Sequence, residues 1–230
     1  MQEYKQNFIE FVVKCGALRF GEFKLKSGRI SPYFFNSGEF KTGAALSKLA
    51  SFYASTVADN ISTNPALYND IVLFGPAYKG IPLVAITALK LSDEHGIDYP
   101  ICYNRKEAKD HGEGGATIGA SLTADQTIVA IEDVVTAGTA IGETKEVLAA
   151  NGGAKLSAVV IAMDRCEVKT EGSSETALQE IARVQGVQIF PVITIFEAIE
   201  YLHNNEIDGV VYINDEIKQN IEDYLKKYGA

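Results

Sequence analysis

Hydrophobic positions along the chain fall into two alternating patterns. Short continuous apolar runs are typical of strands that are buried on both faces of a parallel sheet. Apolar residues spaced three and four apart are typical of helices with one buried face. The runs predict strands at residues 71–74, 99–103, 116–122, 128–131, 156–163 and 187–194. The helical spacing predicts helices at residues 2–14, 42–58, 81–91, from a turn at 136–139 to about 150, 173–185, 195–202 and 215–227.

The alternation of strands and helices predicts an α/β fold: a doubly wound, mostly parallel sheet flanked by helices. Two short apolar segments around the turn at Ser27-Gly28 predict an antiparallel pair outside the main sheet. We expect a single domain over residues 1–230, with a small N-terminal hood formed mainly by about residues 1–40. The alternative is a plain hairpin whose Phe34 and Phe35 are core residues.

Polar residues and glycines mark the ends of some predicted helices. Ser173 and Ser174 are expected to cap the helix that ends before Gly186. Asn214 is expected to cap the last helix of the chain.

Composition and charge limit the class of protein. The 230 residues carry a net charge of −9, and nucleic-acid surfaces depend on clustered Lys and Arg, so no nucleic-acid partner is expected. The N-terminus lacks the pattern of a signal peptide, and no apolar run approaches the roughly 20 residues of a membrane span. Cys15, Cys102 and Cys166 have no CxxC spacing, which indicates reduced thiols. We therefore expect a cytoplasmic protein without a membrane partner.

The most informative stretch joins the strand at residues 128–131 to the helix that follows. Glu132 and Asp133 come directly after the strand, and the small residues 136–139 open the helix. Backbone N–H groups of such a turn can approach a ligand closely, and a helix N-terminus binds anions. Carboxylates accept hydrogen bonds from hydroxyls, so a ribose phosphate could bind with its phosphate at the turn and its hydroxyls at the two acids. The alternative is an ordinary turn whose acids are solvated.

Two further segments carry candidate anion-binding side chains. Lys79 lies in a loop between Gly75 and Gly80, at a strand end where open α/β sheets bind ligands. An exposed lysine is the alternative there. A polar, glycine-rich segment without hydrophobic periodicity then contains Arg105, Lys106, Lys109 and His111. We expect it to be a long loop without regular structure that acts as a lid, with a solvated loop as the alternative.

Four strings of the sequence resemble motifs of the type I phosphoribosyltransferases, in particular of the members that use orotate. They are residues 25–36, 74–80, 104–114 and 128–139. The last string has the family's order of apolar residues, two acids, two apolar residues and Thr-Ala-Gly-Thr, with Glu132 where many members have Asp. The resemblance is nearly full-length. It implies transfer of the 5-phosphoribosyl group of phosphoribosyl pyrophosphate (PRPP) to orotate, with Mg²⁺, giving orotidine 5′-monophosphate and pyrophosphate in de novo pyrimidine (UMP) biosynthesis.

The resemblance also implies roles for individual residues. The PRPP-binding residues would be Lys26, Tyr78, Lys79, Arg105, Lys106, Lys109, His111, Glu132, Asp133, Val134, Val135, Thr136, Ala137, Gly138, Thr139 and Ala140. The orotate-binding residues would be Lys26, Phe34, Phe35, Thr136 and Arg165, with Arg165 on the orotate carboxylate. The catalytic residues would be Arg105, Lys109, His111 and Asp133.

The resemblance further implies a homodimer in which the segment from Arg105 to His111 closes over the neighbouring subunit's site. No cluster in the sequence resembles a protein metal cage, so magnesium is expected on PRPP itself. Cys166 follows Arg165 where relatives commonly have Gln, which puts a thiol next to the expected site. Two alternatives remain: a phosphoribosyltransferase for uracil or a purine, and a PRPP-sensing regulator. Arg165 argues against the first, and the intact cationic segment argues against the second.

Overall fold

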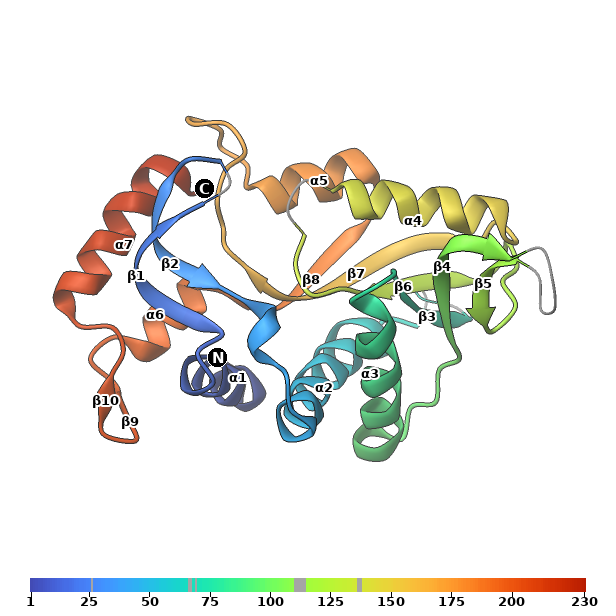
Figure 1. The fold of residues 1–230 in the computed structure, drawn as a ribbon, viewed down its shortest axis with the longest axis horizontal. Helices are drawn as coiled ribbons and strands as arrows, with labels where there is room; N and C mark the ends of the chain where they lie inside the picture. Colours follow the sequence, from blue (N-terminus) through green and yellow to red (C-terminus); the bar gives the residue numbers. More distant parts are fainter. Residues whose placement is uncertain (26, 66–67, 69, 110–114, 136–137) are drawn as a thin grey trace.

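The computed structural model of the chain describes residues 1–25, 27–65, 68, 70–109, 115–135 and 138–230. A mixed sheet lies at the centre, helices cover both of its faces, and a two-stranded hood stands at one end (Figure 1). This arrangement is the doubly wound α/β fold with a hood that the sequence predicts.

Within the described residues the main sheet has six strands, in the order β5-β4-β3-β6-β7-β8. They are β3 (Ile71–Gly75), β4 (Ile101–Lys109), β5 (Gly115–Gly119), β6 (Thr127–Ile131), β7 (Lys155–Asp164) and β8 (Gln188–Thr194). Within the sheet, the neighbouring strands β4, β3, β6, β7 and β8 run parallel to one another. β5 pairs antiparallel with β4 at the edge. The chain extends from β3 to β4 in one direction and from β6 to β8 in the other. The strand order therefore reverses between β3 and β6.

Alternate residues of the central strands face opposite sides of the sheet. Leu73 and Val129 belong to the apolar cluster that includes α2 and α3, whereas Phe74 and Ile128 belong to the cluster that includes α4 and α5. Both faces are therefore apolar, which is why these strands read as continuous apolar runs. The α-helices are α1 (Glu3–Lys14), α2 (Gly43–Val57), α3 (Gly80–His95), α4 (Thr139–Ala150), α5 (Ala177–Gln185), α6 (Ile195–Leu202) and α7 (Asp215–Tyr228).

The hood consists of β1 (Leu18–Lys24) and β2 (Ile30–Phe35), which pair antiparallel as predicted. The C-terminal helix holds it in place. Tyr33 of β2 meets Tyr224 of α7 edge to face, with ring centroids 5.9 Å apart. Arg29 lies over the ring of Tyr228 at 4.6 Å. The hood is thus anchored by residues near the far end of the chain, which Figure 1 shows beside it.

Several short elements complete the chain. A 3₁₀ turn (Ser37–Glu39) leads from the hood to α2, and a π-helical turn (Ala58–Ser62) follows α2. A small antiparallel pair, β9 (Glu206–Ile207) and β10 (Val210–Val211), lies between α6 and α7. The sequence pattern did not predict these elements, because each is too short to show a period.

The expectation of an unstructured loop after residue 103 is wrong for its first part. Residues as far as Lys109 extend β4, and β5 pairs with them antiparallel, Asn104 with Thr117 and Lys109 with Gly115. An antiparallel edge pair can be solvated, so its residues need no apolar alternation. The polar sequence therefore concealed a strand. Residues 110–114 lie outside the described residues.

Two helix ends also differ from expectation. Thr176, and not Ser173 or Ser174, caps α5, because its hydroxyl accepts from Gln179 N–H while the Gln179 side chain accepts from Thr176 N–H. Helix α3 runs four residues beyond the predicted end at Leu91, through a polar last turn, and ends before Gly96 with φ +66°.

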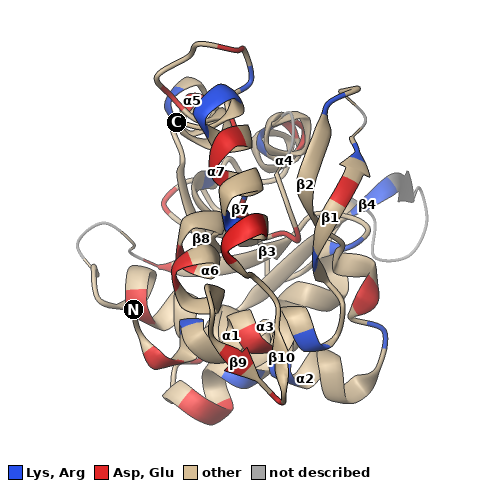
Figure 2. Ribbon diagram, turned by 90° about the vertical axis from the view of Figure 1, so that its left-hand side faces the viewer, with Lys and Arg blue, Asp and Glu red and all other residues tan. Residues whose placement is uncertain are grey.

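Charged residues lie on both helices and strands of the fold. Acidic and basic residues both lie on several helices, and Lys and Arg are also found near the β1–β2 turn and on β4 (Figure 2). Among the residues that the structure describes, no helix is both long and apolar enough to cross a membrane.

Candidate active site

The candidate site lies where the strand order reverses, at the carboxyl ends of β3 and β6. In open α/β sheets, loops diverge at this point and leave a crevice for a ligand. The loop after β3 carries Tyr78 and Lys79, and the loop after β6 carries Glu132 and Asp133. The sequence predicts both loops as ligand-binding segments, and the fold brings them together.

Two glycines allow the loop after β3 to turn back tightly. A Cβ on Gly75 would lie 2.4 Å from the carbonyl oxygen of Gly80, and one on Gly80 would lie 2.6 Å from Pro76 Cδ. Asn104 of β4 holds the same loop, since its side-chain oxygen accepts from Ala77 N–H at 2.8 Å. The Ala77–Tyr78 peptide bond is cis, and the Tyr78 side chain is exposed.

Three residues from distant parts of the chain meet at the centre of the site. Lys79 Nζ lies 2.6 Å from Asp133 Oδ2 and 3.1 Å from Ser37 Oγ. Ser37 Oγ donates to Asp133 Oδ2 at 2.5 Å. The three side chains line a cavity of about 230 Å³ whose other walls are largely apolar and come mainly from α2 and α3. The Asp133 side chain is 11% exposed and that of Lys79 is 67% exposed, so the acid is fixed and the base can move.

The two adjacent acids differ in their protonation. Burial opposes ionisation of Asp133, but hydrogen bonds from Lys79, Ser37 and Val134 N–H outweigh it, so the pKa of Asp133 lies below its ordinary value. Burial raises the pKa of Glu132 to about 7. Tyr53 fixes this corner by donating from its hydroxyl to the Glu132 carbonyl oxygen at 2.8 Å.

The phosphate-binding turn predicted from sequence leads into the N-terminus of α4. Gly138 stands at the N-cap with φ +76°, a left-handed conformation that glycine adopts without strain. Thr139 and Ala140 form the first turn of the helix and are exposed, at a helix end that favours anions. Thr136 and Ala137 lie outside the described residues.

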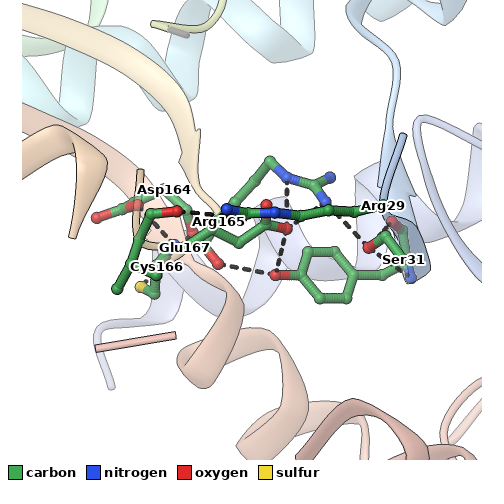
Figure 3. A network of polar contacts seen from close by, with 8 residues as sticks. Arg29, Ser31, Asp164, Arg165, Cys166 and Glu167 are labelled. Atoms are coloured by element: carbon green, nitrogen blue, oxygen red, sulfur yellow. Dashed lines mark hydrogen bonds and ion pairs between the residues drawn. The ribbon is translucent and has the colours of Figure 1, made fainter. Parts of the chain in front are cut away.

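Arg165 follows β7 and is held in a polar network beside the hood (Figure 3). Its Nε and Nη2 lie 3.1 and 2.5 Å from Glu167 Oε1, and Nη2 donates to Ser31 Oγ at 3.0 Å. The guanidinium carbon lies 4.5 Å from the centre of the Tyr33 ring, whose hydroxyl also donates to Glu167 Oε1 at 3.0 Å. Arg165 is thus oriented by neighbours on the loop and on β2.

Phe34 and Phe35 occupy successive positions of β2 and face opposite sides of the hood. Phe34 is half-buried and stacks on Phe23, with centroids 5.5 Å apart. Phe35 is buried in the main apolar cluster and contacts Phe40. Lys26, the remaining predicted residue of the hood, lies outside the described residues, and the orotate-binding roles of all three stay predictions.

The predicted catalytic cations lie on or beyond the β4–β5 edge pair. Arg105 and Lys106 are on β4, and Lys106 Nζ lies 3.9 Å from Glu143 of α4. Lys109 is the last residue of β4, and His111 lies outside the described residues. Of these cations, Lys106 is the one whose contact with α4 the described part of the structure shows.

Five residues that position the site were not predicted from the sequence. These are Ser37, Tyr33, Tyr53, Asn104 and Glu167. Each acts through a contact with a residue at least 27 positions away, except Glu167, which lies two positions from Arg165. Only the proximity of Glu167 to Arg165 was visible in the sequence.

Cys166 is close to the site but is not a reactive thiol. It is buried, and burial raises its pKa to about 12. Cys15 and Cys102 are also free cysteines. In the described part of the chain, no group of three or more His, Cys, Asp or Glu residues could hold a metal ion.

Comparison with known proteins identifies the family. A model of the phosphoribosyl transferase domain matches residues 41–192. The chain is 43% identical over 230 residues to the orotate phosphoribosyltransferase of Clostridium botulinum (strain Alaska E43 / Type E3), covering 100% of both chains. It is 49% identical over 203 residues to that of Pseudomonas fluorescens (strain Pf0-1), covering 88% of this chain and 90% of the relative.

A solved structure leads to the same family. The crystal structure of orotate phosphoribosyltransferase from Francisella tularensis matches with a TM-score of 0.80 and 38% identity, covering 97% of this chain and 100% of that one. Sequence and fold therefore agree over nearly the whole length. The chain belongs to the orotate phosphoribosyltransferase family of phosphoribosyl transferase domain proteins.

Proposed function

We propose that the protein transfers the 5-phosphoribosyl group of PRPP to orotate, giving orotidine 5′-monophosphate and pyrophosphate in de novo pyrimidine (UMP) biosynthesis. The observation that carries the proposal is the pairing of Lys79 with Asp133 at the reversal of strand order, where Asp133 lies on the segment that leads from β6 to the N-terminus of α4. A cation, a carboxylate for hydroxyls and an anion-binding helix end are what a ribose with phosphate groups at both ends requires. Relatives named for the same reaction support it.

The acid pair and the α4 turn would hold the ribose phosphate. Asp133, ionised and fixed, accepts from the ribose hydroxyls, and Glu132 lies beside it. Val134 and Val135 would line the PRPP site beside the acids. The backbone N–H groups and hydroxyls of Thr136, Ala137, Gly138, Thr139 and Ala140 would bind the 5′-phosphate.

Cations on two other segments would bind the pyrophosphate. Tyr78 and Lys79 extend from the loop after β3, and the exposed Lys79 side chain is free to turn from Asp133 to a phosphate oxygen. Arg105 and Lys106 of β4, with Lys109 and His111, supply positive charge when this segment closes over the ligand. Closure also removes water, which would otherwise hydrolyse the activated sugar.

Orotate would bind between the hood and Arg165. Its carboxylate pairs with Arg165, whose guanidinium is pre-oriented by Glu167 and by the Tyr33 ring. Lys26, Phe34, Phe35 and Thr136 complete the proposed base site. A neutral base such as uracil has no group that requires this cation, and Arg165 therefore selects orotate.

The reaction needs no nucleophile from the enzyme, because the orotate ring nitrogen attacks ribose C1 as the bond to the pyrophosphate oxygen breaks. The sugar acquires oxocarbenium character, as in glycoside hydrolysis, and negative charge grows on the departing pyrophosphate. Preorganised donors that face this charge lower the barrier, and removal of one donor typically costs roughly 3 kcal/mol, or about a hundredfold in rate.

Magnesium is proposed as the cofactor. The described residues contain no protein cage for a metal, and the oxygen-rich pyrophosphate is the kind of ligand that Mg²⁺ prefers, so the ion would be carried on PRPP. When bound, it would withdraw charge from the leaving pyrophosphate. A homodimer is proposed as well, with the cationic segment of each subunit closing over its neighbour's site.

Loss of orotate absorbance on addition of PRPP and Mg²⁺ tests the proposal, with uracil, hypoxanthine and adenine assayed in parallel. Turnover with orotate alone is the expected result. Turnover with a different base would overturn the assignment of the base site, whereas the assignment of the PRPP site would still hold. Binding of PRPP without turnover of any base would favour a PRPP-sensing regulator.

A further inference from the structure

Ser37 contacts Asp133 but has no role in the reaction proposed above. It opens the 3₁₀ turn between the hood and α2, and its hydroxyl donates to Asp133 Oδ2 at 2.5 Å. The same hydroxyl accepts from Lys79 Nζ at 3.1 Å. A serine hydroxyl has one donor and two acceptor positions, so both bonds can exist together.

The backbone around Ser37 is held on both sides. Asn36 N–H donates to the Ala17 carbonyl oxygen at 2.7 Å, which ties the end of β2 to the start of β1. The Asn36 side chain accepts from Gly38 N–H at 3.0 Å and donates to Glu39 Oε1 at 3.3 Å. Phe40, next along the chain, is buried. Ser37 is therefore presented to Asp133 by a fixed turn and not by a mobile loop.

The two oxygens of Asp133 have different partners. Oδ1 accepts from Val134 N–H at 2.8 Å, and Oδ2 accepts from Ser37 and from Lys79. If Lys79 turns to the pyrophosphate of PRPP, Oδ2 loses its charged partner and gains an open acceptor position for a ribose hydroxyl. The bond from Val134 N–H then holds Oδ1, and the bond from Ser37 holds Oδ2 of this largely buried carboxylate.

We propose that Ser37 is a positioning residue for Asp133: it holds Oδ2 in orientation while Lys79 exchanges Asp133 for the pyrophosphate of PRPP. The inference rests on the proposed function, because it assigns Asp133 to the ribose hydroxyls. Ser37 touches neither the reacting carbon nor the leaving group, and its effect passes through the carboxylate.

Binding of PRPP to the full-length protein, measured by isothermal titration calorimetry without orotate, tests the role directly. A hydrogen bond to a charged group is worth enough that Ser37→Ala is expected to weaken PRPP binding roughly tenfold or more. The KM for orotate should change little. Ser37→Thr keeps the hydroxyl and should restore most of the affinity. If Ser37→Ala lowers the melting temperature too far for the assay, Ser37→Cys replaces it and should weaken PRPP binding, because a thiol is a poor donor.

Ser51→Ala is the matched control. Ser51 on α2 also donates to a carboxylate, Glu94 Oε1 at 2.9 Å, but on an exposed surface. Its removal should leave PRPP binding unchanged. Equal affinities of wild type and Ser37→Ala would overturn the proposal, as would a loss in Ser37→Thr as large as in Ser37→Ala.

A double-mutant cycle with Asp133→Asn separates a role through Asp133 from a general effect on the turn. If Ser37 acts through the carboxylate, Ser37→Ala should cost little in the Asp133→Asn background. The same loss in both backgrounds would contradict the proposal. If wild type binds PRPP but turns over no orotate, the proposed function fails, and the binding differences among these variants still decide the role of Ser37.

Discussion

Glu132 and Asp133 are adjacent acids with opposite protonation behaviour. Glu132 is half-buried and has no cationic partner at hydrogen-bond distance among the described residues, and the resulting desolvation raises its pKa to about 7. Asp133 has Lys79, Ser37 and a backbone N–H, which together lower its pKa despite burial. Near neutral pH the free protein therefore holds one ionised carboxylate, Asp133, and one carboxyl group, Glu132, with a pKa close to the pH.

The raised pKa of Glu132 predicts a specific dependence of stability on pH. Between the ordinary pKa of 4.5 and about 7, the folded state keeps a proton that the unfolded state has lost, so this contribution to stability falls as pH rises. Glu132→Gln has no such penalty. The free energy of unfolding of Glu132→Gln minus that of wild type should therefore be larger at pH 8 than at pH 5, by on the order of 2 kcal/mol. Urea unfolding at the two pH values measures this change.

Glu206→Gln is the control for that experiment, because Glu206 is exposed and should follow wild type at both pH values. A difference between Glu132→Gln and wild type that does not change with pH would contradict the prediction.

Arg165 is predicted to decide recognition of the base and not of PRPP. Loss of a charge-assisted pair with a carboxylate should raise the KM for orotate by at least about tenfold in Arg165→Ala, with PRPP affinity nearly unchanged. Steady-state kinetics with each substrate varied in turn measures the two effects. Arg183→Ala removes an exposed arginine that pairs with Glu175 and should behave as wild type. Equal losses for both substrates would mean that Arg165 is structural.

At the scale of elements, the sequence predicts best where burial is complete. β3 and β6 are buried on both faces and appear as apolar runs at almost their observed bounds. The extension of β4 could not be predicted, because its residues pair at an edge open to water. At the candidate site, the turn at residues 136–139 could be recognised from the sequence because it is a local string. Ser37 and Tyr33 could not. Their partners are 96 and at least 132 positions away, and no local pattern records such contacts.

The N-terminus of α5 offers a test of a capping residue that the sequence placed wrongly. Thr176 is buried and forms a reciprocal pair with Gln179. Thr176→Ala should lower the free energy of unfolding by about 1 kcal/mol, and Thr176→Ser by much less. Ser174→Ala, at the position expected from sequence, should have almost no effect. Chemical denaturation of the three variants measures this, and a larger loss in Ser174→Ala than in Thr176→Ala would refute the assignment.

At the scale of the whole molecule, both ends of the chain support the network around Arg165, where the proposal places the base. β2 contributes Ser31 and Tyr33, the loop after β7 contributes Arg165 and Glu167, and α7 packs on β2 through Tyr224. The backbone N–H of Val168 also donates to the Tyr228 carbonyl oxygen at 2.7 Å. The hood strands β1 and β2 near the N-terminus are therefore held in place by the helix at the C-terminus.

The proposed sharing of each site between two subunits can be tested by mixing two inactive variants. Lys109→Ala should lower kcat by about a hundredfold while PRPP still binds, and Asp133→Asn should also be nearly inactive. If each site takes Asp133 from one subunit and Lys109 from the other, a mixed dimer of the two variants contains one intact site and one site with both changes. Half of randomly paired dimers are mixed, so roughly a quarter of wild-type activity should return.

Co-refolding of the two differently tagged variants, followed by assay before and after separation of the mixed dimer, measures this recovery. Lys155→Ala, an exposed lysine at the opposite end of the sheet, replaces Lys109→Ala in the control mixture and tests whether refolding alone changes activity. If each subunit instead closes its own segment over its own site, every site in a mixed dimer keeps one damaging change. Mixing would then restore nothing, and the shared site would be ruled out even if the dimer itself were found.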